Sequence, residues 1–313
     1  MLFVKIAIVI KNYLNNCQKN VFIIFFVIYI ITLHIMFIPI LNRFTCNKNQ
    51  LGHIKKLLNK RNMKCIFDYT NENQEKHRTN FKEIMNLTSN MSNETIAVKL
   101  SSLKIDSKTH VENYLDEIIR TSIRNNNKIL IDAENYSIQE EINVISDKFM
   151  EIYNKDALHI FKTYQLYRTD YLDILRHDLE KSRNHNIGFK IVRGAYFNED
   201  KKHNILFNHI EKTHENYNNA IKLFVNHHQL NDKLLCATHN EESIQIATEF
   251  IEKYKLNNIE FAQLMGMSDK LSHKLSDKHI VYKYIPYGDF RDVLPYLVRR
   301  LYENYPMIMN IFK

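Results

Sequence analysis

Two adjacent arginines near the C-terminus are the first residues whose types suggest chemistry. Arg299 and Arg300 lie in an expected helix whose N-cap is Asp289 or Asp292 and whose first turn holds Pro295. Glu303 follows the arginines one turn later. Each guanidinium is a fixed fork of N–H donors, so two of them converging on one point suit a carboxylate or a phosphate. Glu303 is spaced to hold either arginine along the helix. The alternative is a solvated arginine pair with one helical salt bridge.

The elements that must position this pair can be read upstream of it. Val281–Tyr284 has the β-branched and aromatic residues of a strand, and Pro286 and Gly288 then break the chain into a turn. Before them, short apolar runs alternate with longer polar stretches. The predicted strands are Lys64–Tyr69, Ile96–Leu100, Ile129–Asp132, His159–Tyr164, Phe189–Val192, Leu234–Thr238, Ile259–Leu264 and His279–Tyr284. The helix-length segments between them include Glu112–Arg124, Ile138–Tyr153, Thr169–Arg183, Asn204–Asn226 and Glu241–Tyr254.

Strand–helix alternation implies a parallel sheet and an α/β fold. Eight such units in about 240 residues predict a (β/α)8 barrel like that of triosephosphate isomerase, with its chemistry at the carboxyl ends of the strands. A doubly wound sheet is the alternative. No G-x-G-x-x-G follows the first strand, so a Rossmann dinucleotide site is not expected. The Asn-rich stretches Asn71–Asn80, Asn86–Asn93 and Asn125–Asn127 are predicted to be loops.

Residues 1–62 form a separate basic, hydrophobic leader, and residues 63–313 form the barrel domain. No Asp or Glu precedes Asp68, and Val21–Leu41 carries no formal charge. A bilayer needs roughly 20 apolar residues, so this hydrophobic N-terminal helical segment is about long enough to cross one. Three interpretations compete: a membrane anchor, an organellar targeting segment or a buried helix.

Composition argues against several classes of partner. The net charge is +8, but the basic residues are scattered and no groove-reading motif is visible, so no nucleic-acid partner is expected. The four cysteines have no C-x-x-C spacing and no metal-ligand spacing with histidine. We therefore expect neither a bound metal nor a disulfide framework, and free thiols in a reducing compartment.

Most of the remaining polar candidates fall at the ends of predicted strands. Lys99 interrupts an apolar strand, so its charge either points into the barrel mouth or snorkels outward. Asp132 ends another strand, where it could cap a helix or face the same mouth. Gln165 follows the fourth strand, Lys190 lies in the fifth, and Thr238–Asn240 place three polar side chains after the sixth. This clustering is the main support from the residues themselves for an active site.

Four segments, in the same order along the chain, resemble the proline dehydrogenase family of flavin enzymes. They are FKIVRGAYF (189–197), CATHNEESI (236–244), FAQLMGM (261–267) and the last strand and helix, VYKYIPYGDFRDVLPYLVRRLYEN (281–304). Weaker similarities are CIFDYTNEN (65–73), AVKLSSL (97–103), ILIDAEN (129–135) and TYQLY (163–167). Several motifs in the right order are more specific than any one of them. The leader does not resemble the family's own N-terminal helices.

The resemblance implies roles for residues around the substrate, L-proline. It assigns catalysis to Asp132 and Lys190, whose cation would stabilise the anionic reduced flavin. It assigns substrate binding to Lys99, Tyr196, Leu264, Tyr284, Arg299, Arg300 and Glu303. The three cations Lys99, Arg299 and Arg300 would surround the carboxylate. Hydroxyproline-oxidising relatives carry a smaller residue where this chain has Tyr284, which favours plain proline.

The resemblance also implies FAD as cofactor, with the hydride chemistry supplied by the flavin. The cofactor-binding residues would be Ala133, Gln165, Lys190, Arg193, Gly194, Ala195, Thr238, His239 and Asn240. The product would be Δ1-pyrroline-5-carboxylate, in the first step of proline catabolism to glutamate. Activity should rise with pH, because the amine must be neutral when hydride leaves.

The expected setting is the matrix side of the mitochondrial inner membrane, where the electrons would pass to a quinone. Two alternatives stay open for the function. One is a hydroxyproline dehydrogenase of the same fold, and the other is a membrane-anchored inactive remnant.

Overall fold

The computed structural model describes residues 43–71, 74–289 and 293. The chain divides into two compact units, Met1–Arg43 and Phe44–Lys313. The leader segment Val21–Leu41 lies outside the described residues, as do Arg299, Arg300 and Glu303. Within the described ranges, none of the helices combines the length and the apolar character that a membrane crossing requires.

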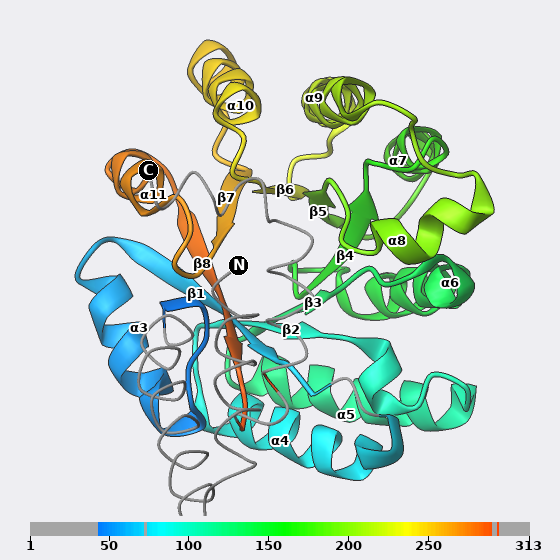
Figure 1. Ribbon diagram of the computed structural model, residues 1–313, viewed down its shortest axis with the longest axis vertical. Coiled ribbons are helices and arrows are strands. Elements are labelled where there is room, and N and C mark those ends of the chain that lie inside the picture. The colour runs from blue at the N-terminus through cyan, green and yellow to red at the C-terminus, as the bar shows by residue number, and fades with distance from the viewer. Residues whose placement is uncertain (1–42, 72–73, 290–292, 294–313) are drawn as a thin grey trace, which may run out of the picture. The chain divides into compact units, whose positions relative to one another are not determined.

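Eight parallel strands close into a barrel in chain order, with helices around the outside (Figure 1), so the predicted (β/α)8 fold is confirmed. The strands are β1 (Met63–Tyr69), β2 (Thr95–Val98), β3 (Lys128–Ile131), β4 (Ile160–Gln165), β5 (Gly188–Val192), β6 (Lys233–Ala237), β7 (Ile259–Leu264) and β8 (Val281–Tyr287). The helices are α3 (Leu51–Asn59), α4 (His77–Asn90), α5 (Lys108–Arg124), α6 (Tyr136–Tyr153), α7 (Tyr171–Glu180), α8 (Phe197–Asp200), α9 (Ile210–His227), α10 (Glu241–Tyr254) and α11 (Asp269–Ser276). Short 3-10 turns are η1 (Lys48–Gln50), η2 (Gln74–Lys76), η3 (Leu100–Leu103) and η4 (Lys201–His203).

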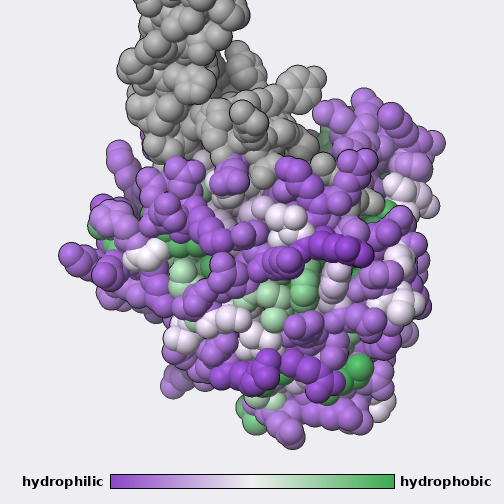
Figure 2. Space-filling view, turned by 90° about the horizontal axis from the view of Figure 1, so that it is seen from below, coloured by the Kyte–Doolittle hydropathy of each residue, from purple (hydrophilic) through white to green (hydrophobic). Residues whose placement is uncertain are grey.

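Side chains along each strand alternate between the barrel interior and the layer beneath the helices. Ile66 belongs to a cluster that fills the interior together with Tyr282 and Tyr284. Its neighbours Cys65 and Phe67 belong to the larger cluster between sheet and helices. On the face in Figure 2, hydrophilic residues cover most of the surface and hydrophobic ones appear in small areas between them. Beneath the surface, helices such as α5 turn their apolar side toward the sheet, where Val111, Leu115 and Ile118 are buried.

One helix lies where the sequence predicted loops. α4 (His77–Asn90) runs through much of the two Asn-rich stretches 71–80 and 86–93, so that expectation was wrong. Ile84 and Leu87 are buried on its inner face, and the Asn80 side chain donates a hydrogen bond to the Ser102 carbonyl at 2.9 Å. Packing of this face outweighs the modest helix propensity of asparagine. The third stretch, 125–127, is a loop as predicted.

The barrel unit begins ahead of the boundary expected from the sequence. Cys46 forms a parallel bridge with Tyr287 at the carboxyl end of β8, and Leu51 at the start of α3 is buried in the core. Residues 44–62 therefore pack as part of the unit that holds the barrel. The chain enters the barrel at the carboxyl end of the strands, and α3 then runs back to the start of β1.

A buried ion pair joins two loops at the opposite end of the barrel. Arg183 donates to Asp232 at 3.0 Å, and Asp232 also accepts the backbone N–H groups of Ile187 and Gln229, each at 2.8 Å. Replacing Asp232 with alanine should lower the free energy of unfolding by about 3–5 kcal/mol, because a buried guanidinium loses its counter-ion. Urea unfolding measures this loss. Asp173→Ala, at an exposed ion pair on α7, should change it by less than about 1 kcal/mol.

Candidate active site

A cavity of about 580 Å³ opens at the carboxyl ends of the strands. Every candidate from the sequence that the structure describes lines it. These residues are Lys99, Asp132, Ala133, Gln165, Lys190, Arg193, Gly194, Ala195, Tyr196, Thr238, His239, Asn240, Leu264 and Tyr284. They come from seven different strands, β2 to β8, or the turns that follow them, so barrel closure brings them together.

Sequence reasoning missed several residues of the same wall. They are Thr163, Val192, His214, Ala237, Glu241, Ala262 and Gln263. The period of two along a strand could have found some of them. Thr163 lies two residues before Gln165, Val192 two after Lys190 and Ala262 two before Leu264. His214 belongs to α9, and no local signal connects it to a strand end.

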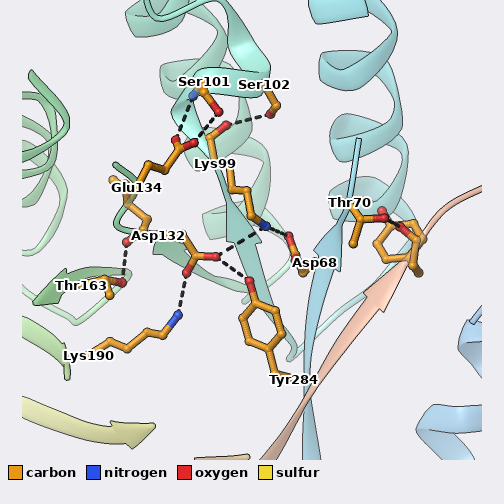
Figure 3. A network of polar contacts seen from close by, with 12 residues as sticks. Asp68, Thr70, Lys99, Ser101, Ser102, Asp132, Glu134, Thr163, Lys190 and Tyr284 are labelled. Carbon is orange, nitrogen blue, oxygen red and sulfur yellow. Dashed lines mark hydrogen bonds and ion pairs between the residues drawn. The ribbon is translucent and has the colours of Figure 1, made fainter. Parts of the chain in front are cut away.

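Asp132 stands at the centre of a buried polar network (Figure 3). Its Oδ1 lies 2.6 Å from Nζ of Lys190, and its Oδ2 accepts the hydroxyl of Tyr284 at 2.5 Å. The same Oδ2 lies 3.7 Å from Nζ of Lys99. Groups from β5, from β8 and from the end of β2 thus converge on the one carboxylate that follows β3.

Lys99 faces this mouth rather than snorkelling outward. It is buried, and its Nζ lies 2.5 Å from Oδ1 of Asp68 at the end of β1. Asp68 is a partner that sequence reasoning missed, although a carboxylate near the end of a strand was visible in CIFDYTNEN. Charges of alternating sign therefore run Asp68, Lys99, Asp132, Lys190 along the carboxyl ends of the strands (Figure 3). In this row of alternating charges each buried group lies beside a group of opposite sign, which offsets the cost of removing a single charge from water.

The electrostatic balance at Asp132 decides its protonation state. Burial acts to raise its pKa, but the ammonium groups of Lys190 and Lys99 and the hydroxyl of Tyr284 outweigh burial, so the pKa lies below its usual value. Asp132 is therefore ionised at neutral pH and accepts hydrogen bonds without donating any. Nζ of Lys190 also lies 5.0 Å from the centre of the Tyr284 ring, a cation–π contact.

Gln165 presents a buried acceptor to the cavity. Its Nε2 donates to the Glu134 carbonyl at 2.9 Å, and its Oε1 accepts no hydrogen bond from any described residue. The Glu134 carboxylate is itself held by the N–H and hydroxyl of Ser101 (Figure 3). A buried oxygen without a donor is costly unless a ligand supplies one.

The turn after β5 brings backbone to the cavity wall. Gly194 has φ +139°, a conformation that side chains rarely adopt, and a Cβ there would lie 2.4 Å from ring carbons of Tyr167. Tyr167 is fixed beneath it, because its hydroxyl donates to Asp200 at 2.5 Å and its N–H donates to the Arg193 carbonyl at 2.7 Å. Glycine is therefore required at this point.

His239 is a neutral imidazole. Its Nε2 accepts the Leu264 N–H at 3.4 Å, which places the proton on Nδ1, facing the hydroxyl of Ser268 at 3.2 Å. Burial, reinforced by the nearby Lys283 cation, lowers the pKa of His239 to about 4. It therefore presents no positive charge to the cavity at neutral pH.

This lowered pKa predicts a pH dependence of stability. The unfolded chain binds a proton on His239 near pH 6.5 and the folded chain only near pH 4, so folding loses stability as pH falls between those values. The loss should be about 2 kcal/mol between pH 7.5 and pH 5. Urea unfolding of wild type and His239→Gln at both pH values checks this. An equal acid loss in both proteins would contradict the assignment.

Comparison with known proteins identifies the family. The family model of proline dehydrogenase matches residues 51–307. The chain is 36% identical over 211 residues, 61% of its length, to proline dehydrogenase 1, mitochondrial, of Dictyostelium discoideum, and 31% identical over 193 residues, 56% of its length, to that of Homo sapiens. These matches cover 37% and 32% of the two relatives, so the chain spans about a third of their length. A hydroxyproline dehydrogenase of Xenopus laevis is 29% identical over 64% of this chain and 46% of its own.

Solved structures show the same fold. Proline utilization A from Bdellovibrio bacteriovorus superposes with a TM-score of 0.77 at 16% identity, over 85% of this chain and 33% of that one. The protein from Corynebacterium freiburgense gives a TM-score of 0.74 at 18% identity, over 85% of this chain and 31% of that one. The barrel, the cavity at its carboxyl end and the family match over most of the sequence agree. The chain therefore belongs to the proline dehydrogenase family.

Proposed function

We propose that this protein oxidises L-proline to Δ1-pyrroline-5-carboxylate with FAD as the hydride acceptor. The observation that carries the proposal is the network of Lys190 and Tyr284 around the ionised Asp132, inside the cavity of a proline dehydrogenase family member.

The cavity residues fit a flavin. Bound FAD would supply the electron sink for the hydride that leaves the substrate. The buried Oε1 of Gln165 offers an acceptor to a ring N–H, and the turn at Gly194 brings backbone to the wall without a side chain. The volume lies within the range of roughly 300–1,000 Å³ usual for ligand sites. Lys190 is the cation that would stabilise negative charge on the reduced ring.

Substrate binding needs more positive charge than the described network offers. Lys99 and Lys190 are balanced by Asp68 and Asp132, so the four groups are together close to neutral. Arg299 and Arg300 are proposed to supply the excess charge for the proline carboxylate, with Glu303 orienting them. Tyr196, Leu264 and Tyr284 would wall the ring, and Asp132 would hold the two lysines in place.

The cellular setting is part of the proposal. Several relatives are named mitochondrial proline dehydrogenases, and the acid-free leader with its uncharged segment Val21–Leu41 suits mitochondrial targeting or attachment to the inner membrane. A quinone at the matrix side of that membrane is the proposed electron acceptor.

Anaerobic reduction tests the proposal. The full chain, loaded with FAD and freed of excess cofactor, should lose its flavin absorbance when L-proline is added, and trans-4-hydroxy-L-proline should act much more slowly. Faster reduction of the flavin by hydroxyproline would establish the alternative function, a hydroxyproline dehydrogenase, which is the name of the Xenopus relative. A folded chain that retains no flavin would support the inactive remnant instead.

A further inference from the structure

The Arg193 guanidinium joins four elements around the cavity. Its Nε donates to Nδ1 of His214 on α9 at 2.9 Å, one Nη donates to Oγ1 of Thr238 at 2.6 Å and the other donates to Oγ of Ser243 on α10 at 2.9 Å. The guanidinium also lies 4.4 Å from the centre of the Tyr217 ring. Three fixed donors and a stacked face leave the side chain little freedom.

These contacts fix the turn between β6 and α10. Oγ1 of Thr238 also accepts the Asn240 N–H at 3.0 Å, and the Asn240 side chain accepts the Ser243 N–H at 2.9 Å and so caps α10. The Ser243 hydroxyl donates onward to Asn218 at 2.6 Å. Arg193 therefore ties its own turn to residues 238–243, and residues 238–241 form part of the cavity wall.

His214 is the acceptor that completes this arrangement. Because Nδ1 accepts a hydrogen bond from the Nε–H of Arg193, it must itself be unprotonated. A proton on Nδ1 would end the hydrogen bond and place two cations together. The charged groups that face His214 are Arg193, Glu211 on its own helix and Glu242 on α10. The two carboxylates attract a proton, and the guanidinium opposes it.

We propose that His214 is a positioning residue that, through the Arg193 guanidinium, holds the Thr238–Asn240 turn in the geometry that binds the flavin cofactor. The inference rests on the proposed function. Burial and the Arg193 charge lower the pKa of His214 below its usual value, so its neutral form prevails at neutral pH. Acidification then weakens the cofactor site by protonating His214.

Two substitutions of His214 distinguish its role as a hydrogen-bond acceptor from the space that its ring fills. His214→Asn places an oxygen where Nδ1 lies and cannot be protonated, whereas His214→Leu fills the space without an acceptor. The apoprotein of the full chain is titrated with FAD, following flavin fluorescence at pH 7.5 and 5.5. At pH 7.5 the Leu variant should bind FAD about tenfold more weakly than wild type and the Asn variant within about twofold of wild type. At pH 5.5 the wild type should bind FAD more weakly than at pH 7.5, and both variants should keep the FAD affinities that they have at pH 7.5.

A third substitution tests the route through Arg193. Arg193→Lys loses the fork, so adding His214→Leu to it should cost no further affinity. Additive losses of affinity in the double variant would show that His214 acts on the cofactor directly and would overturn the proposal. The proposal would also be overturned if His214→Leu bound FAD as tightly as wild type at both pH values. If wild type binds no FAD, the proposed function fails and this inference fails with it. If wild type binds FAD and proline reduces it, but the variants behave as wild type, only the inference fails.

Discussion

Asp132→Asn should reduce the rate of proline-dependent flavin reduction by about 100-fold, since displacement of reacting groups by about 1 Å costs that much. The carboxamide keeps the shape of Asp132 but removes the charge that holds Lys190 at 2.6 Å and Lys99 at 3.7 Å. Two buried ammonium groups then lose a shared counter-ion and move apart. Stopped-flow reduction under anaerobic conditions at saturating proline measures the effect.

A second buried carboxylate provides a matched control. Asp178 contacts Lys162 at 3.0 Å and the hydroxyl of Tyr164 at 2.8 Å, as Asp132 contacts Lys190 and Tyr284, but none of these three residues lines the cavity. Both Asn variants should lose up to about 3–5 kcal/mol of unfolding free energy. Only Asp132→Asn should slow reduction. Equal slowing in both variants would mean that the loss reflects stability and not the site.

Gly194→Ala is expected to lower FAD affinity by at least about 100-fold, which corresponds to about 2.7 kcal/mol. The new Cβ would lie 2.4 Å from the Tyr167 ring, in a backbone conformation that alanine rarely adopts. Tyr167 cannot yield easily, because Asp200 and the Arg193 carbonyl hold it. The turn that carries Arg193, Ala195 and Tyr196 must therefore shift away from the Tyr167 ring, which changes the cavity wall. Titration of the apoprotein with FAD, beside a thermal unfolding curve, measures both consequences.

Gly52 offers a contrasting site for the same substitution. It lies in the first turn of α3, and a Cβ there would meet no atom within 4 Å. Gly52→Ala should leave FAD affinity unchanged and raise the free energy of unfolding by up to about 1 kcal/mol, since alanine favours helix. If Gly194→Ala bound FAD as tightly as Gly52→Ala does, the turn after β5 would have no part in holding the cofactor.

Much of the fold could be predicted because its signal is local. Alternating strand and helix patterns identified all eight strands, and α10 was predicted with its observed bounds, Glu241–Tyr254. Polar residues at strand ends, together with the family resemblance, identified most of the described cavity wall, since a parallel barrel collects those ends at one face. The alternative of a doubly wound sheet was excluded only by closure between β1 and β8.

Two local expectations failed because packing outweighed propensity. α4 forms through asparagine-rich sequence, as its apolar face is buried on the barrel. Residues 44–62 looked like part of a basic leader, yet the Cys46 bridge to Tyr287 and the burial of Leu51 place them in the barrel unit. The composition of a segment indicates its intrinsic preference for helix or loop, but it does not indicate which surface of the protein the segment packs against.

The sequence by itself determined the barrel and the strand ends at which polar groups gather. Only the tertiary structure decided which groups pair: Lys99 with Asp68, Tyr284 with Asp132 and Arg193 with His214, partners separated by 31, 152 and 21 residues. Spacing along a chain fixes neighbours within one strand or one helical turn. Ring closure of eight strands sets the distances between elements, and those distances decide which charges neutralise each other and which remain for a ligand.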